Sequence, residues 1–203
     1  DRLLEKADAL LVGGAMTYTF GLAKGLGVGK SLVEPDRVDV AKAALDKAQA
    51  RNVKFLLPLD NVVATPVKTD KLDKKGKPVT VFENPRTITD VNIPADEAGL
   101  DIGPQSIAAY ADAIAGAKTV LWNGPMGMFE DARFAAGTFA AAQAVAQAPQ
   151  KGATSIIGGG DSVKALNKSG LGDQVTFAST GGGASLEFLE GQELPGVAAL
   201  TNH

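Results

Sequence analysis

Two runs of three glycines carry the residues best suited to chemistry. The first run, Gly158–Gly160, is followed at once by Asp161 and Ser162, and the second is Gly181–Gly183. Glycine lets the main chain contact a ligand because no Cβ intervenes, and the free N–H groups at a helix start attract anions. One glycine is enough for a tight structural turn. Three in a row, twice, therefore favour phosphate binding over a role in the turns alone.

Each glycine run stands between an apolar segment and a segment of helical pattern. We expect strands over 154–157 and 175–179, and helices over 161–168 and 186–190. If the two strands are neighbours in a parallel sheet, their loops end at the same edge and could hold two ends of one polyphosphate. Asp161 could cap its helix or hold Mg²⁺, which typically takes one or two carboxylates together with phosphate oxygens. The two roles are compatible.

The same order of strand, turn and helix fills most of the chain. The other expected strands are 9–12, 53–57, 62–64 and 118–122, and the other expected helices are 16–25, 36–51 with Asp36 as its cap, 104–115 and 130–148. Unbroken apolar strands separated by helices are typical of a parallel sheet covered on both faces. Residues 65–98 are polar and lysine-rich and predict a hairpin turning near 75–77, whereas 193–200 show no pattern of their own. The sequence predicts an α/β fold, a doubly wound, Rossmann-like, mainly parallel sheet with helices on both faces and a small hairpin excursion.

Other candidate site residues have a structural alternative. The segment Gly27–Ser31 reads G-V-G-K-S, but Lys24 stands where a P-loop requires its first glycine. Glu130, at the end of a glycine-containing turn, could accept hydrogen bonds from ribose hydroxyls or serve as a charge at a helix start. Trp122 and Phe129 are more typical of a core than of base stacking.

Composition excludes several classes of function. The 203 residues have a formal net charge of −3, no cysteine and one histidine, His203, at the last position, which argues against a histidine triad or a zinc site. We expect a cytoplasmic protein with no nucleic-acid or membrane partner. Neither glycine run completes G-x-G-x-x-G, because Val163 and Leu186 hold the last positions. Phosphoryl transfer is therefore favoured over hydride transfer.

Six ordered motifs closely resemble the C-terminal, nucleotide-binding half of the phosphoglycerate kinase family. They are L-L-V-G-G-A-M-T-Y-T-F (10–20), V-G-K-S-L (28–32), G-L-D-I-G-P (99–104), W-N-G-P-M-G-M-F-E (122–130), G-G-G-D-S (158–162) and T-G-G-G-A-S-L-E-F-L-E-G (180–191), followed by L-P-G-V-A-A-L (194–200). The resemblance runs nearly end to end and implies that residues 1–203 form one nucleotide-binding domain. It also implies reversible phosphoryl transfer between 1,3-bisphosphoglycerate and Mg-ADP, which gives 3-phosphoglycerate and Mg-ATP in glycolysis.

The resemblance assigns a role to each matching residue. Gly13, Gly14, Gly99 and Leu100 would border the adenine, Asn123 and Pro125 would line the nucleotide site, and Glu130 would bind the ribose. Gly159, Gly160, Asp161 and Ser162 would hold the ADP or ATP phosphates and Mg²⁺, with Asp161 as the metal contact. Gly181, Gly182 and Gly183 would face the phosphoryl group during transfer.

The chain also departs from the family pattern. Ser162 stands where threonine is usual and keeps the hydroxyl, and Ala15 replaces a usual glycine. The family's upstream segment G-G-A-K-V-S-D-K, with its first strand and phosphate-binding lysines, is absent, as is the N-terminal domain that binds 3-phosphoglycerate. We therefore expect this chain alone not to turn over, and the full-length protein to be a monomer. Two alternatives remain, a non-catalytic adenine-nucleotide-binding module and a nicotinamide-dependent oxidoreductase domain.

Overall fold

A computed structural model describes residues 2–200, and its strands form two parallel sheets and one antiparallel sheet. The parallel sheets are β1 (Ala9–Leu11) with β2 (Lys54–Leu56), and β6 (Thr119–Asn123), β7 (Thr154–Gly158) and β8 (Phe177–Ser179). The antiparallel sheet has the order β4 (Pro78–Ile88), β3 (Asn61–Leu72), β5 (Ala98–Ile102). The expected α/β fold with mainly parallel pairing outside the hairpin is confirmed.

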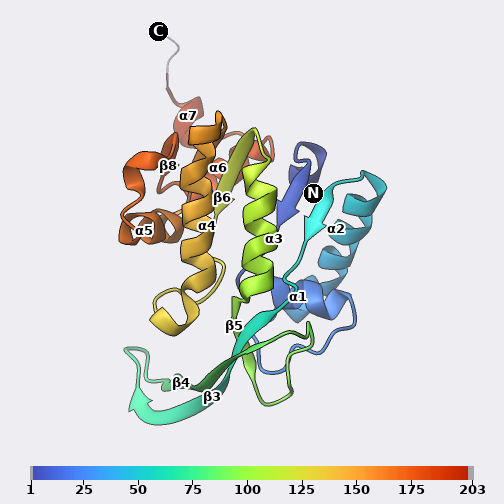
Figure 1. Ribbon diagram of the computed structural model, residues 1–203, viewed down its shortest axis with the longest axis vertical. Helices are drawn as coiled ribbons and strands as arrows, with labels where there is room; N and C mark the ends of the chain where they lie inside the picture. Colours follow the sequence, from blue (N-terminus) through green and yellow to red (C-terminus); the bar gives the residue numbers. More distant parts are fainter. Residues whose placement is uncertain (1, 201–203) are drawn as a thin grey trace.

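Seven α-helices connect and cover these strands within the described residues. They are α1 (Met16–Ala23), α2 (Val38–Ala50), α3 (Pro104–Ala115), α4 (Ala136–Gln147), α5 (Gly160–Lys168), α6 (Gly182–Leu189) and α7 (Pro195–Ala198). Short 3₁₀ turns cover Leu3–Glu5, Pro35–Arg37, Ala132–Phe134, Ala148–Lys151 and Gly172–Gln174. Figure 1 shows α3 and α4 side by side in front of β6. None of the described helices is long and apolar enough to cross a membrane.

The register of the second parallel sheet aligns the ends of its strands. Asn123, the last residue of β6, pairs with Gly158 at the end of β7, which in turn pairs with Ser179 at the end of β8. The loops that follow these three strands therefore start at one edge of the sheet. This arrangement confirms that the two glycine runs follow neighbouring strands.

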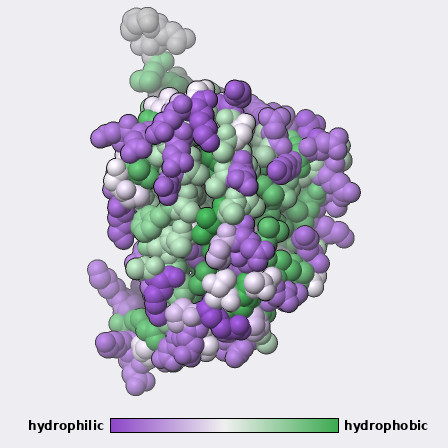
Figure 2. Space-filling model, in the orientation of Figure 1, coloured by the Kyte–Doolittle hydropathy of each residue, from purple (hydrophilic) through white to green (hydrophobic). Residues whose placement is uncertain are grey.

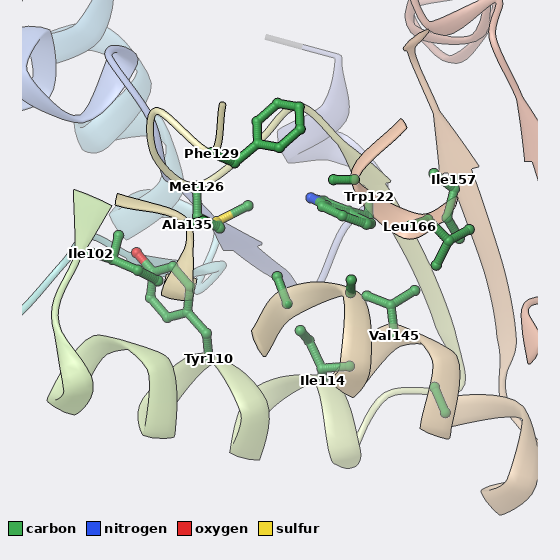
Figure 3. Close-up of a cluster of buried hydrophobic side chains, with 14 of the residues drawn as sticks. Ile102, Tyr110, Ile114, Trp122, Met126, Phe129, Ala135, Val145, Ile157 and Leu166 are labelled. Atoms are coloured by element: carbon green, nitrogen blue, oxygen red, sulfur yellow. The ribbon is translucent and has the colours of Figure 1, made fainter. Parts of the chain in front are cut away.

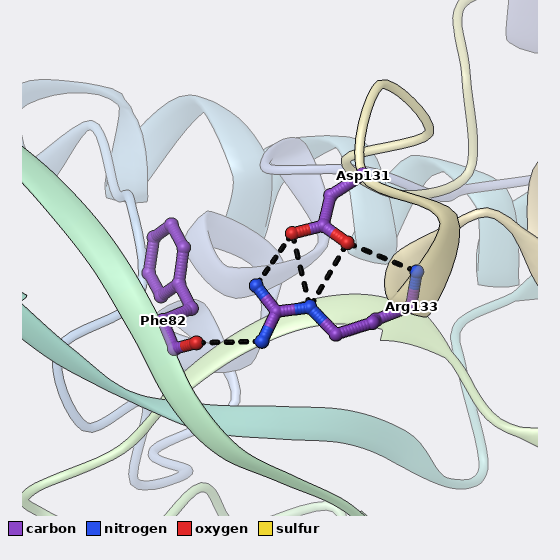
Figure 4. A network of polar contacts seen from close by, with 3 residues as sticks. All are labelled: Phe82, Asp131 and Arg133. Atoms are coloured by element: carbon purple, nitrogen blue, oxygen red, sulfur yellow. Dashed lines mark hydrogen bonds and ion pairs between the residues drawn. The ribbon is translucent and has the colours of Figure 1, made fainter.

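The hairpin forms where it was expected and projects from the body at the lower end of Figure 1. Its turn passes through Gly76, which has a positive φ of 73°. Arg133 ties the hairpin to the body: it donates to the Phe82 carbonyl at 2.8 Å and pairs with Asp131 at 2.6 Å (Figure 4). The side-chain hydrogen bond from Arg133 holds the pKa of the Asp131 carboxyl below its usual range. The Phe82 ring also meets Phe134 edge to face, with centroids 6.1 Å apart.

The largest hydrophobic core lies between α3, α4, α5 and the β6–β7–β8 sheet (Figure 3). Trp122 and Phe129 are both buried in it, as the sequence suggested. Figure 2 shows hydrophilic side chains over much of the outer surface on this face, including the hairpin. Because Trp122 and Phe129 are both buried in this core, they anchor the two ends of the loop between them.

Three expectations about element boundaries are wrong. The helix expected over 130–148 begins only at Ala136, because the Asp131 side chain accepts from the Arg133 N–H at 3.0 Å and closes a separate 3₁₀ turn. Asp36 does not cap α2; it lies within the preceding turn, and no side chain caps that helix.

The C-terminal segment differs as well. Residues 195–198 form the short helix α7, where none was expected, with Pro195 at the first position that proline favours. His203 lies outside the described residues.

Candidate functional site

The first glycine run forms the junction between β7 and α5. Gly159 precedes the helix with φ +91°, a backbone conformation that residues with a Cβ rarely adopt. Its N–H donates to the Ser179 carbonyl at 3.0 Å, which fixes the junction to the end of β8. The first-turn N–H groups of α5 cannot be paired within the helix, so they are available to an anion.

The second glycine run lies against the first. A Cβ on Gly182, which begins α6, would overlap the backbone of Gly159. Asn123 completes the contact: its side-chain N–H donates to the Gly182 carbonyl at 3.2 Å, and its Oδ1 lies 2.7 Å from the position that a Cβ on Gly159 would occupy. The ends of three strands thus meet at one point, and the close approach there leaves no room for a Cβ on Gly159 or Gly182.

The loop after β6 is fixed to α5 and to the core. The Gly124 N–H donates to the buried Ser162 hydroxyl at 2.6 Å, and the Trp122 indole N–H donates to the Gly124 carbonyl at 2.7 Å. Ser162 is therefore engaged in positioning this loop. A direct contact of its hydroxyl with a phosphate stays a prediction.

The far part of the same loop contacts the remaining candidate residues. The Gly14 N–H donates to the Met126 carbonyl, and the Met128 N–H donates to the Leu100 carbonyl, both at 2.8 Å. The loop between Asn123 and Phe129 therefore bridges two groups of residues, one around the glycine runs and one around Gly14 and Leu100. A ligand lying along this loop would touch both groups.

The segment Gly27–Ser31 contacts the strand that contains Gly99. The Gly99 N–H donates to the buried Ser31 hydroxyl at 2.9 Å, and Val28 forms an isolated bridge with Ile93. Its contacts are those of a structural turn, in keeping with the argument against a P-loop.

Asp101 is a positioning residue that the sequence analysis missed. Its carboxylate is buried and accepts N–H groups from Ile102 at 2.9 Å and from Gly137, in the first turn of α4, at 2.8 Å. Burial raises the pKa of this carboxyl to about 6. The signal in the sequence was an acid inside the otherwise uncharged strand Ala98–Ile102.

Asp161 and Glu130 are the exposed acids of the site. Asp161 lies in the first turn of α5, where Gly159 is the N-cap residue, and its side chain is exposed, so a ligand can reach its carboxylate. Glu130 is exposed directly after the buried Phe129. No group of three or more potential metal-ligating side chains occurs between residues 2 and 200. A divalent cation would therefore have to arrive with phosphate oxygens as additional ligands.

A groove of about 370 Å³ lies elsewhere, on the hairpin side. Its rim carries Arg86 and Arg133, but each guanidinium is already paired, with Glu97 and Asp131 respectively. The starts of α3 and α4 beside it are occupied by the Asp60 and Asp101 carboxylates. The residues of the two glycine runs do not line this groove, and the groove is therefore separate from the candidate site.

Comparison with known proteins places these features in a family. The family model described as "Phosphoglycerate kinase" matches residues 1–192. The phosphoglycerate kinase of Clostridium novyi (strain NT) is 55% identical over 202 residues, which are 100% of this chain and 47% of that protein. That of Chlorobaculum tepidum is 54% identical over 202 residues, covering 100% of this chain and 48% of its own length.

Solved structures agree with the sequence relatives. Phosphoglycerate kinase from Coxiella burnetii superimposes with a TM-score of 0.79 at 43% identity and covers 97% of this chain and 47% of its own. The enzyme from Pyrococcus horikoshii OT3 gives a TM-score of 0.72 at 32% identity, covering 98% of this chain and 47% of its own. The chain spans about half the length of the relatives that it matches. It belongs to the phosphoglycerate kinase family.

Proposed function

We propose that residues 1–203 form the nucleotide-binding half of a phosphoglycerate kinase. The observation that carries this proposal is the contact of the two glycine-run helices, α5 and α6, at Gly159 and Gly182, with Asn123 between them. Phosphoryl transfer requires positioning and stabilisation of charge more than side-chain acid–base chemistry. Two converging helix starts supply backbone N–H groups for that purpose.

Each group of candidate residues would contact a different part of the nucleotide. Gly13, Gly14, Gly99 and Leu100 would border adenine beside the loop that Met126 and Met128 hold in place. Pro125 and Asn123 would line the middle of the site, and Glu130 would accept hydrogen bonds from the ribose. Gly159, Gly160 and Ser162 would surround the phosphates of ADP or ATP, and Gly181–Gly183 would stabilise the phosphoryl group between donor and acceptor.

Magnesium fits this set of residues. Asp161 offers one exposed carboxylate at the start of α5, which matches the one or two carboxylates that Mg²⁺ uses beside phosphates. When bound, Mg²⁺ would neutralise negative charge on the phosphate oxygens. The substrate 3-phosphoglycerate would bind to the part of the relatives' length that this chain does not span, so we expect no turnover from the chain alone.

A Mg-ADP titration followed by the fluorescence of Trp122 tests the proposal. Trp122 is the only tryptophan, and its indole N–H donates a hydrogen bond to the Gly124 carbonyl beside the proposed site. We expect saturable binding that weakens at least severalfold in Asp161→Ala. The matched control is Asp112→Ala, which removes an exposed acid from α3, away from the glycine loops.

The outcomes separate this function from its alternatives. Equal affinities in wild type and Asp161→Ala would contradict the metal role, and absence of binding by a folded sample would contradict the proposed site. Preferential binding of NADH over ADP would support an oxidoreductase domain. A non-catalytic module would bind ADP but gain no kinase activity when mixed with the N-terminal half of a relative.

A further inference from the structure

Helix α5 carries two lysines on the side that faces Phe129, at the end of the loop between Asn123 and Phe129. The ammonium nitrogens of Lys164 and Lys168 lie 5.7 and 5.8 Å from the centroid of the Phe129 ring. Phe129 is buried and directly precedes Glu130, the proposed ribose ligand. The helix that starts at the first glycine run therefore also brings positive charge to the far end of the loop.

Two ammonium groups this close to one ring repel each other unless an anion lies nearby. Lysines four residues apart on a helix repel one another, and here both approach a single aromatic ring. A ring face attracts a cation within about 6 Å, but that attraction is modest at exposed sites. Among residues 2–200, neither lysine forms an ion pair. Two unpaired ammonium groups held at one place are suited to an anionic ligand.

The position of Lys164 fits the phosphates of a nucleotide. Lys164 follows Gly160 by four residues, which is about 6 Å along the helix axis. Both residues belong to the exposed face of α5, because Ser162, Ala165 and Leu166 are the buried ones. A diphosphate at the helix start and a ribose at Glu130 would place the connecting phosphate beside Lys164.

We propose that Lys164, assisted by Lys168, adds positive charge to the phosphate site from α5 and binds the phosphates of a nucleoside diphosphate. The inference rests on the proposed function and deepens it, because the glycine loops themselves carry no cation. Lys164 contributes most, since it is one turn closer to Gly160. Lys168 acts at longer range and raises the local positive potential.

Isothermal titration of Mg-ADP and of adenosine tests the proposal. The proteins are the wild-type chain, Lys164→Gln, Lys168→Gln and the control Lys151→Gln, which changes an exposed lysine in the turn before β7, at the opposite end of that strand. We expect Lys164→Gln to raise the Kd for Mg-ADP about threefold to tenfold and Lys168→Gln to raise it less. Adenosine, which has no phosphate, should bind all four proteins equally. Lys164→Arg should retain most of the affinity.

Salt dependence gives a second readout. If Lys164 faces a phosphate, the loss of affinity for Mg-ADP with added salt should be shallower in Lys164→Gln than in wild type. Unchanged Mg-ADP affinity in both lysine variants would overturn the inference while leaving the proposed function intact. Equal weakening of ADP and adenosine would also overturn it, because the lysines would then act through Phe129 or Glu130. Failure of the wild-type chain to bind Mg-ADP would overturn both proposals.

Discussion

At the scale of single residues, Asp101 couples the stability of the site to pH. Its carboxylate receives two backbone N–H groups but is buried, and burial raises its pKa to about 6 from the ordinary value of 3.8. The folded chain thus binds this proton more tightly than the unfolded chain. The protonated Asp101 therefore contributes to the free energy of unfolding. This contribution is fully present below about pH 4 and is lost as the pH rises to about 6.

Replacing Asp101 isolates this effect. Asp101→Asn removes the titration and keeps one of the two oxygen acceptors, so its unfolding free energy should be lower at acid pH but should lack the decline with rising pH seen in wild type. Between pH 4 and pH 7 the difference between the two proteins should change by on the order of 3 kcal/mol, since each pKa unit corresponds to about 1.4 kcal/mol. Urea unfolding at several pH values measures this change. Parallel pH profiles for the two proteins would show that Asp101 has an ordinary pKa.

The residue scale also shows what the sequence could reveal. Asp161 and Gly159 could be proposed as site residues because an acid and glycines follow a strand directly, a pattern with a physical reason. Asp101 and Ser31 were not, because their importance depends on donors that are far away in the chain: Gly137 for Asp101, and Gly99 for Ser31. Local patterns do not contain such pairings.

At the scale of elements, close backbone contact between Gly159 and Gly182 fixes the positions of the starts of α5 and α6. Gly182→Ala would place a methyl group in the backbone of Gly159, so the two loops would have to separate. We expect a loss of about 1–3 kcal/mol in unfolding free energy, as for other overpacked sites. Gly183→Ala is the matched control, because nothing lies within 4 Å of its Cβ position.

The control has an expected direction of its own. Gly183 lies in the first turn of α6, where alanine is a better helix former, so Gly183→Ala should leave stability unchanged or raise it by up to about 1 kcal/mol. Thermal unfolding of the two variants beside wild type measures the contrast. Two variants of equal stability would mean that the contact between the glycine runs is loose.

Element boundaries were predictable where the local pattern acted alone and unpredictable where a side chain bonded to the backbone. The hairpin and helices α3 and α5 follow their patterns closely. The helix expected from Glu130 fails because Asp131 captures a backbone N–H, and β5 was missed because its five residues acquire their role only by pairing with β3.

At the scale of the molecule, the two parallel sheets are separate. Strand β1 pairs with β2, and β6 pairs with β7, but no ladder joins β1 to β6 within residues 2–200. The two sheets are connected instead by side chains and loops: Leu11 and Leu56 pack against the main core, and the Gly14 N–H donates to the Met126 carbonyl. The class of fold was predictable from alternating strands and helices. This division was not, because strand periodicity does not state which strands are neighbours.

Tyr110 of α3 forms a side-chain hydrogen bond to the sheet of β1 and β2. Its hydroxyl is buried, lies 2.6 Å from the Val12 carbonyl and 3.2 Å from that of Leu56, and can donate to either. Tyr110→Phe keeps the ring but leaves a buried carbonyl without this donor, so we expect a loss of about 1–3 kcal/mol in unfolding free energy. Hydrogen exchange should accelerate in β1 and β2, while the β6–β7 ladder serves as the internal control. Uniform acceleration in all strands would instead mean that the two sheets unfold as one unit, with the shared core and not the Tyr110 hydroxyl determining their cohesion.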